Sequence, residues 1–251
     1  MCIVISHRGF CRGNSAIENT TESIANAIAF GITDIEFDIR KTVDDIFVVS
    51  HDDTIYNLAG ELMTITTATY DSLHRFESSV ERFEELLLRM SDVPRVQPIR
   101  FILDIKTNDI SGRFIKLLDD SVARFPDMTF VYTSFNHTVL RSRLSNVVDF
   151  GAMICHIPSV VELESYTYHW LGMSCEDVTE DIVTMVHSVG KILYVYTPNS
   201  RTMIRRLVEW GVDAIYTDSI DSAVNELYAV SNVRTEQPHE RIHIDTFVTS
   251  L

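Results

Sequence analysis

The sequence predicts a single (β/α)8 barrel, and three observations support that fold class. The chain has 251 residues, close to the usual length of such a barrel. Short apolar segments alternate with segments of helical period about eight times, in units of roughly 30 residues, which is typical of parallel βαβ folds. Polar residues follow the ends of several predicted strands, where barrels of this class build their sites.

Nine short apolar segments are predicted strands. In chain order they are Cys2–Ser6, Asp34–Arg40, Ile46–Ser50, Phe101–Ile105, Thr129–Thr133, Phe150–Cys155, Leu171–Ser174, Ile192–Tyr196 and Ala214–Thr217. A doubly wound open sheet would show the same alternation. The barrel is favoured because no glycine-rich GxGxxG loop follows the first strand.

Helical periodicity predicts helices between and after these strands. They fall at Thr20–Phe30, Gly112–Arg124, Thr138–Leu144, Thr179–Ser188, Arg201–Trp210 and Ser222–Val230. The first has the usual boundary residues, because Asn19 or Thr20 can cap its start and Gly31 follows its end.

Residues 1–230 are the predicted barrel. The segment at about 53–98 is longer than a plain connection and contains the acidic, helix-like stretch Glu81–Arg89. It is expected to form an elaborated loop over one side of the barrel mouth. Residues 231–251 are expected to be a polar tail after the last helix.

The charge balance excludes one class of partner. The chain carries 21 Lys and Arg against 36 Asp and Glu, a net charge of −15. Such a protein repels polyanions, so binding of nucleic acid is not expected. A small phosphate substrate stays compatible, because a metal ion can supply local positive charge.

The sequence shows neither a signal peptide nor a run of 18 apolar residues. It therefore predicts a cytoplasmic protein without integral membrane association. Nothing in the sequence sets an oligomeric state.

Two histidines follow predicted strands. His7 comes at the end of the first strand, next to Arg8, and His51 comes directly after Ile46–Ser50. A histidine can move protons and an arginine can bind phosphate through its fork of donors. The alternative interpretation of Ser6-His7-Arg8 is a solvated turn.

Acidic residues share strand faces with each other and with a lysine. Glu36 and Asp38 are two apart, as are Asp104 and Lys106, so each pair projects from one face. Carboxylates on an apolar strand need a partner, and a hard divalent cation is a suitable one. The alternative is pairing of Glu36 and Asp38 with the basic residues that follow them, Arg40 and Lys41.

This inventory fits metal-assisted attack at a phosphorus centre. The two histidines form a plausible acid–base pair, Asp104 can complete a three-carboxylate metal site, and Lys106 can hold a phosphate oxygen. A serine hydrolase and a P-loop protein are disfavoured, because neither GxSxG nor GxxxxGK[ST] occurs.

The chain resembles the glycerophosphodiester phosphodiesterase family through eight short elements in the family's order. They are His7-Arg8-Gly9, Glu18-Asn19-Thr20, Glu36-x-Asp38, His51-Asp52, Asp104-x-Lys106, Ser134-Phe135, Thr197-x-Asn199 and the run from Gly211 to Asp218. Together they span nearly the whole chain outside the tail.

The resemblance implies a (β/α)8 barrel with a small insertion after the second unit, at about residues 53–98. It implies hydrolysis of a small-molecule glycerophosphodiester to sn-glycerol 3-phosphate and an alcohol, with Mg²⁺ or Ca²⁺. In the family pattern, His7 and His51 are the acid–base pair. Glu36, Asp38 and Asp104 stand at the metal positions, and Arg8 and Lys106 stand where the phosphate is held.

The chain departs from the family pattern at a few positions. Ile17 replaces a usual proline, and Asp104 stands where glutamate is common. Tyr196 replaces a tryptophan of the seventh strand, which keeps an aromatic wall for the substrate and adds a hydroxyl to the alcohol pocket.

Two other functions remain open. The Asp-x-Lys-Thr sequence at residue 104 is also similar to the sphingomyelinase D-like phospholipases, which would act on lysophospholipids or sphingomyelin. The other hypothesis is a non-catalytic binding protein with the same barrel fold, because a fold does not determine a function.

Overall fold

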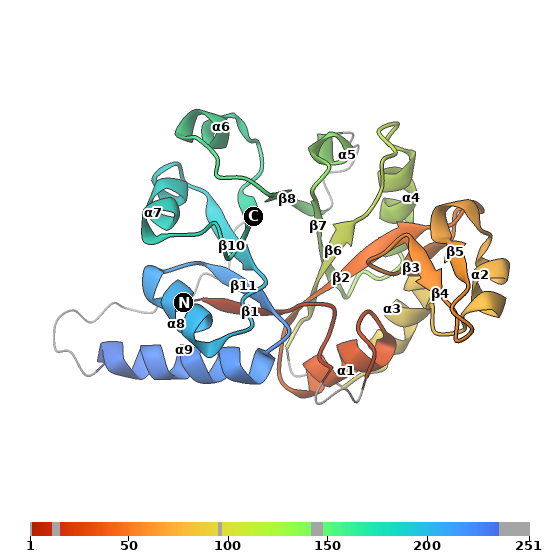
Figure 1. The fold of residues 1–251 in the computed structure, drawn as a ribbon, viewed down its shortest axis with the longest axis horizontal. Coiled ribbons are helices and arrows are strands. Elements are labelled where there is room, and N and C mark those ends of the chain that lie inside the picture. Colours follow the sequence, from red (N-terminus) through yellow and green to blue (C-terminus); the bar gives the residue numbers. More distant parts are fainter. Residues whose placement is uncertain (1, 12–15, 95–96, 142–147, 236–251) are drawn as a thin grey trace.

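The computed structural model describes residues 2–11, 16–94, 97–141 and 148–235, and it confirms the barrel. Eight parallel strands follow one another around it in the order β1, β2, β6, β7, β8, β9, β10 and β11 (Figure 1). They are Ile3–Ser6, Asp34–Lys41, Arg100–Ile105, Thr129–Ser134, Asp149–Ile154, Trp170–Ser174, Ile192–Tyr196 and Ala214–Thr217. The sheet closes because β1 pairs with both β2 and β11.

Helices surround the barrel, as the alternating sequence pattern predicts. They are α1 (Thr21–Ala29), α3 (Phe83–Ser91), α4 (Arg113–Val122), α5 (His137–Arg141), α6 (Val160–Ser165), α7 (Glu180–Ser188), α8 (Arg201–Trp210) and α9 (Ile220–Thr235). Helix α6 has no counterpart among the predicted helices, and α9 runs five residues past its predicted end. Among the described residues, no helix has the length and apolarity needed to cross a membrane.

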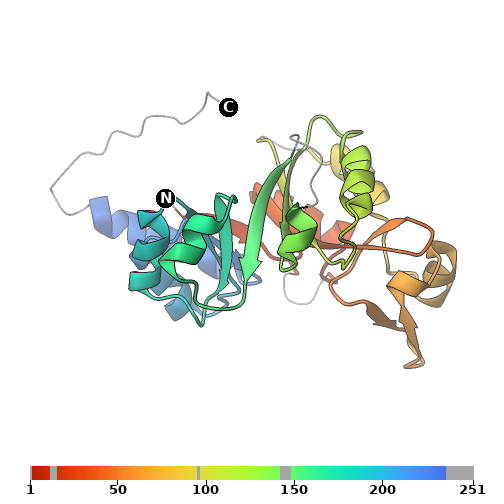
Figure 2. The same ribbon diagram turned by 90° about the horizontal axis from the view of Figure 1, so that it is seen from above.

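The insertion lies between β2 and its helix α3. Strand β3 (Phe47–Val49) pairs antiparallel with β2, so the predicted strand Ile46–Ser50 is a hairpin partner and not a barrel strand. The hairpin of β4 (Thr54–Tyr56) and β5 (Leu62–Thr64), the 3₁₀ turn Ile65–Thr67 and α2 (Tyr70–Phe76) follow. Figure 2 shows the hairpin, in orange, extending away from the barrel.

Helix α3 belongs to the barrel wall although it falls inside the predicted 53–98 segment. Its apolar face is buried, and the Phe83 ring lies 6.1 Å from that of Phe37 on β2. The insertion itself therefore consists of the residues between β2 and α3.

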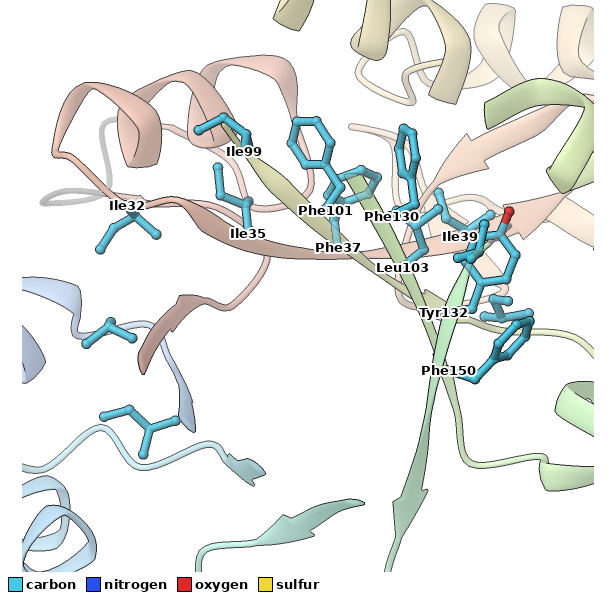
Figure 3. Packing of buried hydrophobic residues seen from close by; sticks show 14 of the residues in the cluster. Ile32, Ile35, Phe37, Ile39, Ile99, Phe101, Leu103, Phe130, Tyr132 and Phe150 are labelled. Carbon is cyan, nitrogen blue, oxygen red and sulfur yellow. The ribbon is translucent and has the colours of Figure 1, made fainter. Parts of the chain in front are cut away.

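Alternating side chains give the barrel two apolar layers. One faces inward and includes Ile5, Ile102, Val131, Tyr194 and Tyr216. The other faces the helices, as Figure 3 shows for a row of side chains along neighbouring strands. There the Phe101 ring packs 5.6 Å from Phe37 and 5.9 Å from Phe130. This packing fixes the strand ends that carry the site.

Candidate active site

Three buried carboxylates form the centre of the site. Glu36 and Asp38 project inward from β2, and Asp104 from β6 stands directly beside Asp38 in the parallel register. One oxygen from each residue lies within 4.8 Å of the others, and all three residues are at least 94% buried. The spacing rule therefore placed these side chains correctly on one face.

Two cations from other elements compensate part of this charge. The backbone amide of Arg8 donates to the Glu36 carboxylate (3.0 Å), and the guanidinium Nε of Arg8 lies 3.2 Å from the Asp38 carboxylate. The Lys106 ammonium donates to Asp104 (2.7 Å) and lies 3.2 Å from Asp38.

The alternative pairing of the acids with Arg40 and Lys41 is therefore wrong. The side chain of Arg40 donates instead to the carbonyl of His51. The Lys41 ammonium pairs with Asp45.

The three acids fit a hard divalent cation. Burial raises the pKa of Glu36 to about 8, with a further contribution from the Asp38 charge. Burial also raises the pKa of Asp104, whose Oδ1 is buried without a hydrogen-bond partner. A cation bound by these oxygens would give Asp104 Oδ1 a partner and would offset the remaining negative charge of the three carboxylates.

His7 is held at the end of β1 by a carboxylate. Its Nδ1 lies 2.7 Å from Asp218 Oδ1, and Asn199 donates to the other oxygen of Asp218 at 2.6 Å. Burial lowers the pKa of His7, but the Asp218 hydrogen bond and the nearby Glu36 outweigh it and raise the pKa.

His51 follows β3, within the insertion, and lines the same cavity as His7. The Ser50 amide donates to the Asp38 carbonyl (3.1 Å), which fixes this loop against β2. The His51 Nδ1 lies 2.8 Å from Asp52 Oδ1. Both catalytic candidates thus use Nδ1 for a carboxylate, which leaves Nε2 for substrate.

Glu18 and Asn19 support the site from the loop before α1. Glu18 accepts from the Arg8 guanidinium at 2.7 Å. The Asn19 amide donates to Asp38 Oδ2 and its oxygen accepts from the Asp38 amide. These contacts orient a phosphate-binding candidate and a metal-binding candidate.

All eight predicted site residues line one cavity of about 200 Å³. They are His7, Arg8, Glu36, Asp38, His51, Asp104, Lys106 and Tyr196. The Tyr196 hydroxyl donates to the Ile154 carbonyl at 2.8 Å, so this hydroxyl already has a partner within the barrel.

Sequence reasoning missed several groups of this cavity. Thr133, Met153 and Tyr216 also line it, and inward alternation along β7, β8 and β11 could have found them. The Asp218 contact with His7 was missed because it joins residues 211 positions apart.

Comparison with known proteins finds similarity over most of the chain. Residues 7–222 match the model of the glycerophosphoryl diester phosphodiesterase family. The glycerophosphodiester phosphodiesterase of Bacillus altitudinis is 24% identical over 246 residues, covering 89% of this chain and 97% of that protein.

Solved structures show the same fold. A glycerophosphodiester phosphodiesterase from Parabacteroides distasonis superposes with a TM-score of 0.79 at 23% identity, covering 92% of this chain and 98% of that one. An Oleispira antarctica phosphodiesterase, solved with its product sn-glycerol-3-phosphate, gives 0.79 at 21% identity and covers 90% and 96%. The chain therefore belongs to the glycerophosphoryl diester phosphodiesterase family and is a phosphodiesterase of that family.

Proposed function

We propose that this phosphodiesterase hydrolyses glycerophosphodiesters to sn-glycerol 3-phosphate and an alcohol. The observation that carries the proposal is the arrangement of two carboxylate-held histidines, His7 and His51, around the buried acid triad in one cavity. The product bound in the similar Oleispira antarctica enzyme supports the substrate class.

Glu36, Asp38 and Asp104 would hold a divalent cation, Mg²⁺ or Ca²⁺. When bound, such a cation polarises a phosphoryl oxygen and offsets the charge that develops in the transition state. Oxygen-only ligands are the set that both of these hard cations prefer.

The chain's own groups supply the remaining chemistry. Arg8 and Lys106 place positive charge beside the acids, where they can bind the non-bridging phosphate oxygens. One histidine accepts a proton from the nucleophile, and the other donates a proton to the departing alkoxide. Asp218 and Asp52 keep both rings oriented for this transfer.

The nucleophile is either water or the glycerol 2-hydroxyl. The second route gives a cyclic phosphate first and gains from the proximity of a group on the same molecule. Trapping a cyclic intermediate by phosphorus NMR distinguishes the two routes.

The test is release of glycerol 3-phosphate from glycerophosphocholine and glycerophosphoethanolamine, with Mg²⁺, with Ca²⁺ and with EDTA. We expect release that requires a divalent cation and falls at least ~100-fold in His7→Ala and in His51→Ala, as loss of an acid–base group predicts. His169→Ala is the control, because His169 is exposed just before β9, at the opposite end of a barrel strand.

A folded His51→Ala protein with undiminished turnover would contradict the proposal. Turnover that persists in EDTA would contradict the metal site. Lysophosphatidic acid or ceramide phosphate as the product, without glycerol 3-phosphate, would favour the sphingomyelinase D-like reading instead.

A further inference from the structure

A second hollow of about 550 Å³ adjoins the catalytic cavity. The two spaces share Lys106 and Phe135. Its other walls come from the insertion, through Asp53 and Thr66, and from the loop after β6, through Asn108. A diester bound at Lys106 can therefore extend one arm into the catalytic cavity and the other into this hollow.

The hollow has equal numbers of cationic and anionic side chains, and each of them already has a partner. Arg40 lies 3.8 Å from Asp53, and Lys106 is paired with two of the metal-site acids. The carboxylate of Asp109 accepts from the amide of Phe114 and from Ser111. With two cations and two carboxylates on these walls, neither a cationic nor an anionic alcohol gains a net electrostatic attraction from them.

The polar groups left for a ligand include both donors and acceptors. Arg40 uses Nε and Nη2 on the His51 carbonyl, and its Nη1 faces Asp53 only at long range. The Asn108 side chain is exposed and has no hydrogen-bond partner among the described residues. Asp53 accepts from Thr66 and keeps lone pairs for a further donor.

An aromatic face completes the hollow where it joins the catalytic cavity. Phe135 is 45% exposed, with Lys106 Nζ 5.6 Å from its ring centre. Such a face packs well against the carbon–hydrogen side of a ring or short polyol.

From these contacts we propose that the hollow binds the alcohol arm of the diester and selects an uncharged polyhydroxyl alcohol. Hydroxyl groups both donate and accept hydrogen bonds, which matches a charge-balanced wall carrying both kinds of group. The proposal rests on the proposed function and adds its substrate class. Inositol and glycerol head groups belong to the preferred class, and choline and ethanolamine do not.

The test compares kcat/KM for glycerophosphoinositol, glycerophosphocholine and glycerophosphoethanolamine in the wild type. We expect at least a fivefold preference for the inositol diester. Asn108→Ala is expected to lower that preference mainly through a higher KM, because it removes a contact made to the head group alone. Asn225→Ala, an exposed asparagine on α9, is the matched control and should leave the preference unchanged.

Saturation-transfer NMR with free inositol and with choline chloride gives a second readout that needs no turnover. Inositol signals that weaken in Asn108→Ala, with no choline signal, support the proposal. Equal kcat/KM for the three diesters, a preference for choline, or inositol binding that Asn108→Ala leaves intact would overturn it. Wild-type protein that hydrolyses none of the diesters but binds inositol in this hollow would overturn the proposed function alone.

Discussion

At the floor of the catalytic cavity, the hydroxyl of Tyr216 is buried without a hydrogen-bond partner. Burial raises the pKa of this phenol well above its ordinary value, so the hydroxyl stays protonated. Leaving a buried polar group unsatisfied costs about 1–3 kcal/mol. We therefore expect Tyr216→Phe to keep or raise the free energy of unfolding of the metal-free protein, measured by urea denaturation in EDTA.

Tyr132→Phe is the matched control for that measurement. Tyr132 is equally buried, but its hydroxyl donates to Asp119 at 3.1 Å. Its loss should cost about 1.5–3 kcal/mol, the range for a hydrogen bond to a charged group. Equal destabilisation by the two variants would show that the Tyr216 hydroxyl is satisfied in solution.

Single residues of the site differ in how well the sequence revealed them. The pair Glu36 and Asp38 could be found because strand alternation is a local rule. The contact of Asp218 with His7 could not, because it depends on β1 and β11 meeting at the barrel seam. The position of the Tyr196 hydroxyl could not be found either, because it donates to the carbonyl of Ile154 on β8, two strands away in the barrel.

The turn from β1 into α1 depends on one glycine. Gly9 has a φ of +86°, and a Cβ added there would lie 2.3 Å from Ser23 Oγ on α1. Ser23 in turn donates to the carbonyl of Arg8. We expect Gly9→Ala to cost about 2–5 kcal/mol, from left-handed strain and overpacking together, and to reduce turnover by displacing Arg8.

Gly31→Ala separates these two causes. Gly31 has a φ of +94° after α1, but nothing lies within 4 Å of an added Cβ. The Gly31→Ala variant should therefore lose only the free energy of backbone strain, about 1–2 kcal/mol. Denaturant unfolding of both variants measures the difference, and an equal loss would mean that Ser23 moves aside at no cost.

Elements were predictable where periodicity and length agreed. Strands such as Ile192–Tyr196 and Ala214–Thr217 match the prediction because the buried barrel strands are short, continuous apolar runs. The role of Ile46–Ser50 was not predictable, because an apolar run does not reveal whether its pairing is parallel or antiparallel. Helix α6 has six residues, with one buried, too few to show a period.

At the scale of the whole molecule, barrel closure gathers groups from both ends of the chain at one mouth. Residues on or just after β1, β2, β6, β7, β8, β10 and β11, together with His51 of the insertion, line the cavity. In a chain with a net charge of −15, an anionic diester needs a local concentration of positive charge. Arg8, Lys106 and a bound cation would provide it within the otherwise repulsive field.

The site also makes the stability of the whole molecule depend on pH. The pKa of Glu36 in the folded chain is about 8, above its ordinary 4.5. Between these values the folded chain holds a proton that the unfolded chain has released, so stability falls as pH rises through the window. The raised pKa of His7 acts in the same direction, whereas carboxyls with lowered pKa, such as Asp109, lose their contribution only in acid.

We therefore expect the metal-free protein to be less stable at about pH 8 than at about pH 5.5, and a divalent cation to stabilise it more at the higher pH. The cation takes the place of the proton on the triad, so its binding strengthens as the carboxyls ionise. Urea denaturation with EDTA and with Mg²⁺ or Ca²⁺ at both pH values measures the effect. Glu36→Gln should flatten the slope, since it cannot ionise, and an unchanged slope would assign the pH dependence to other groups.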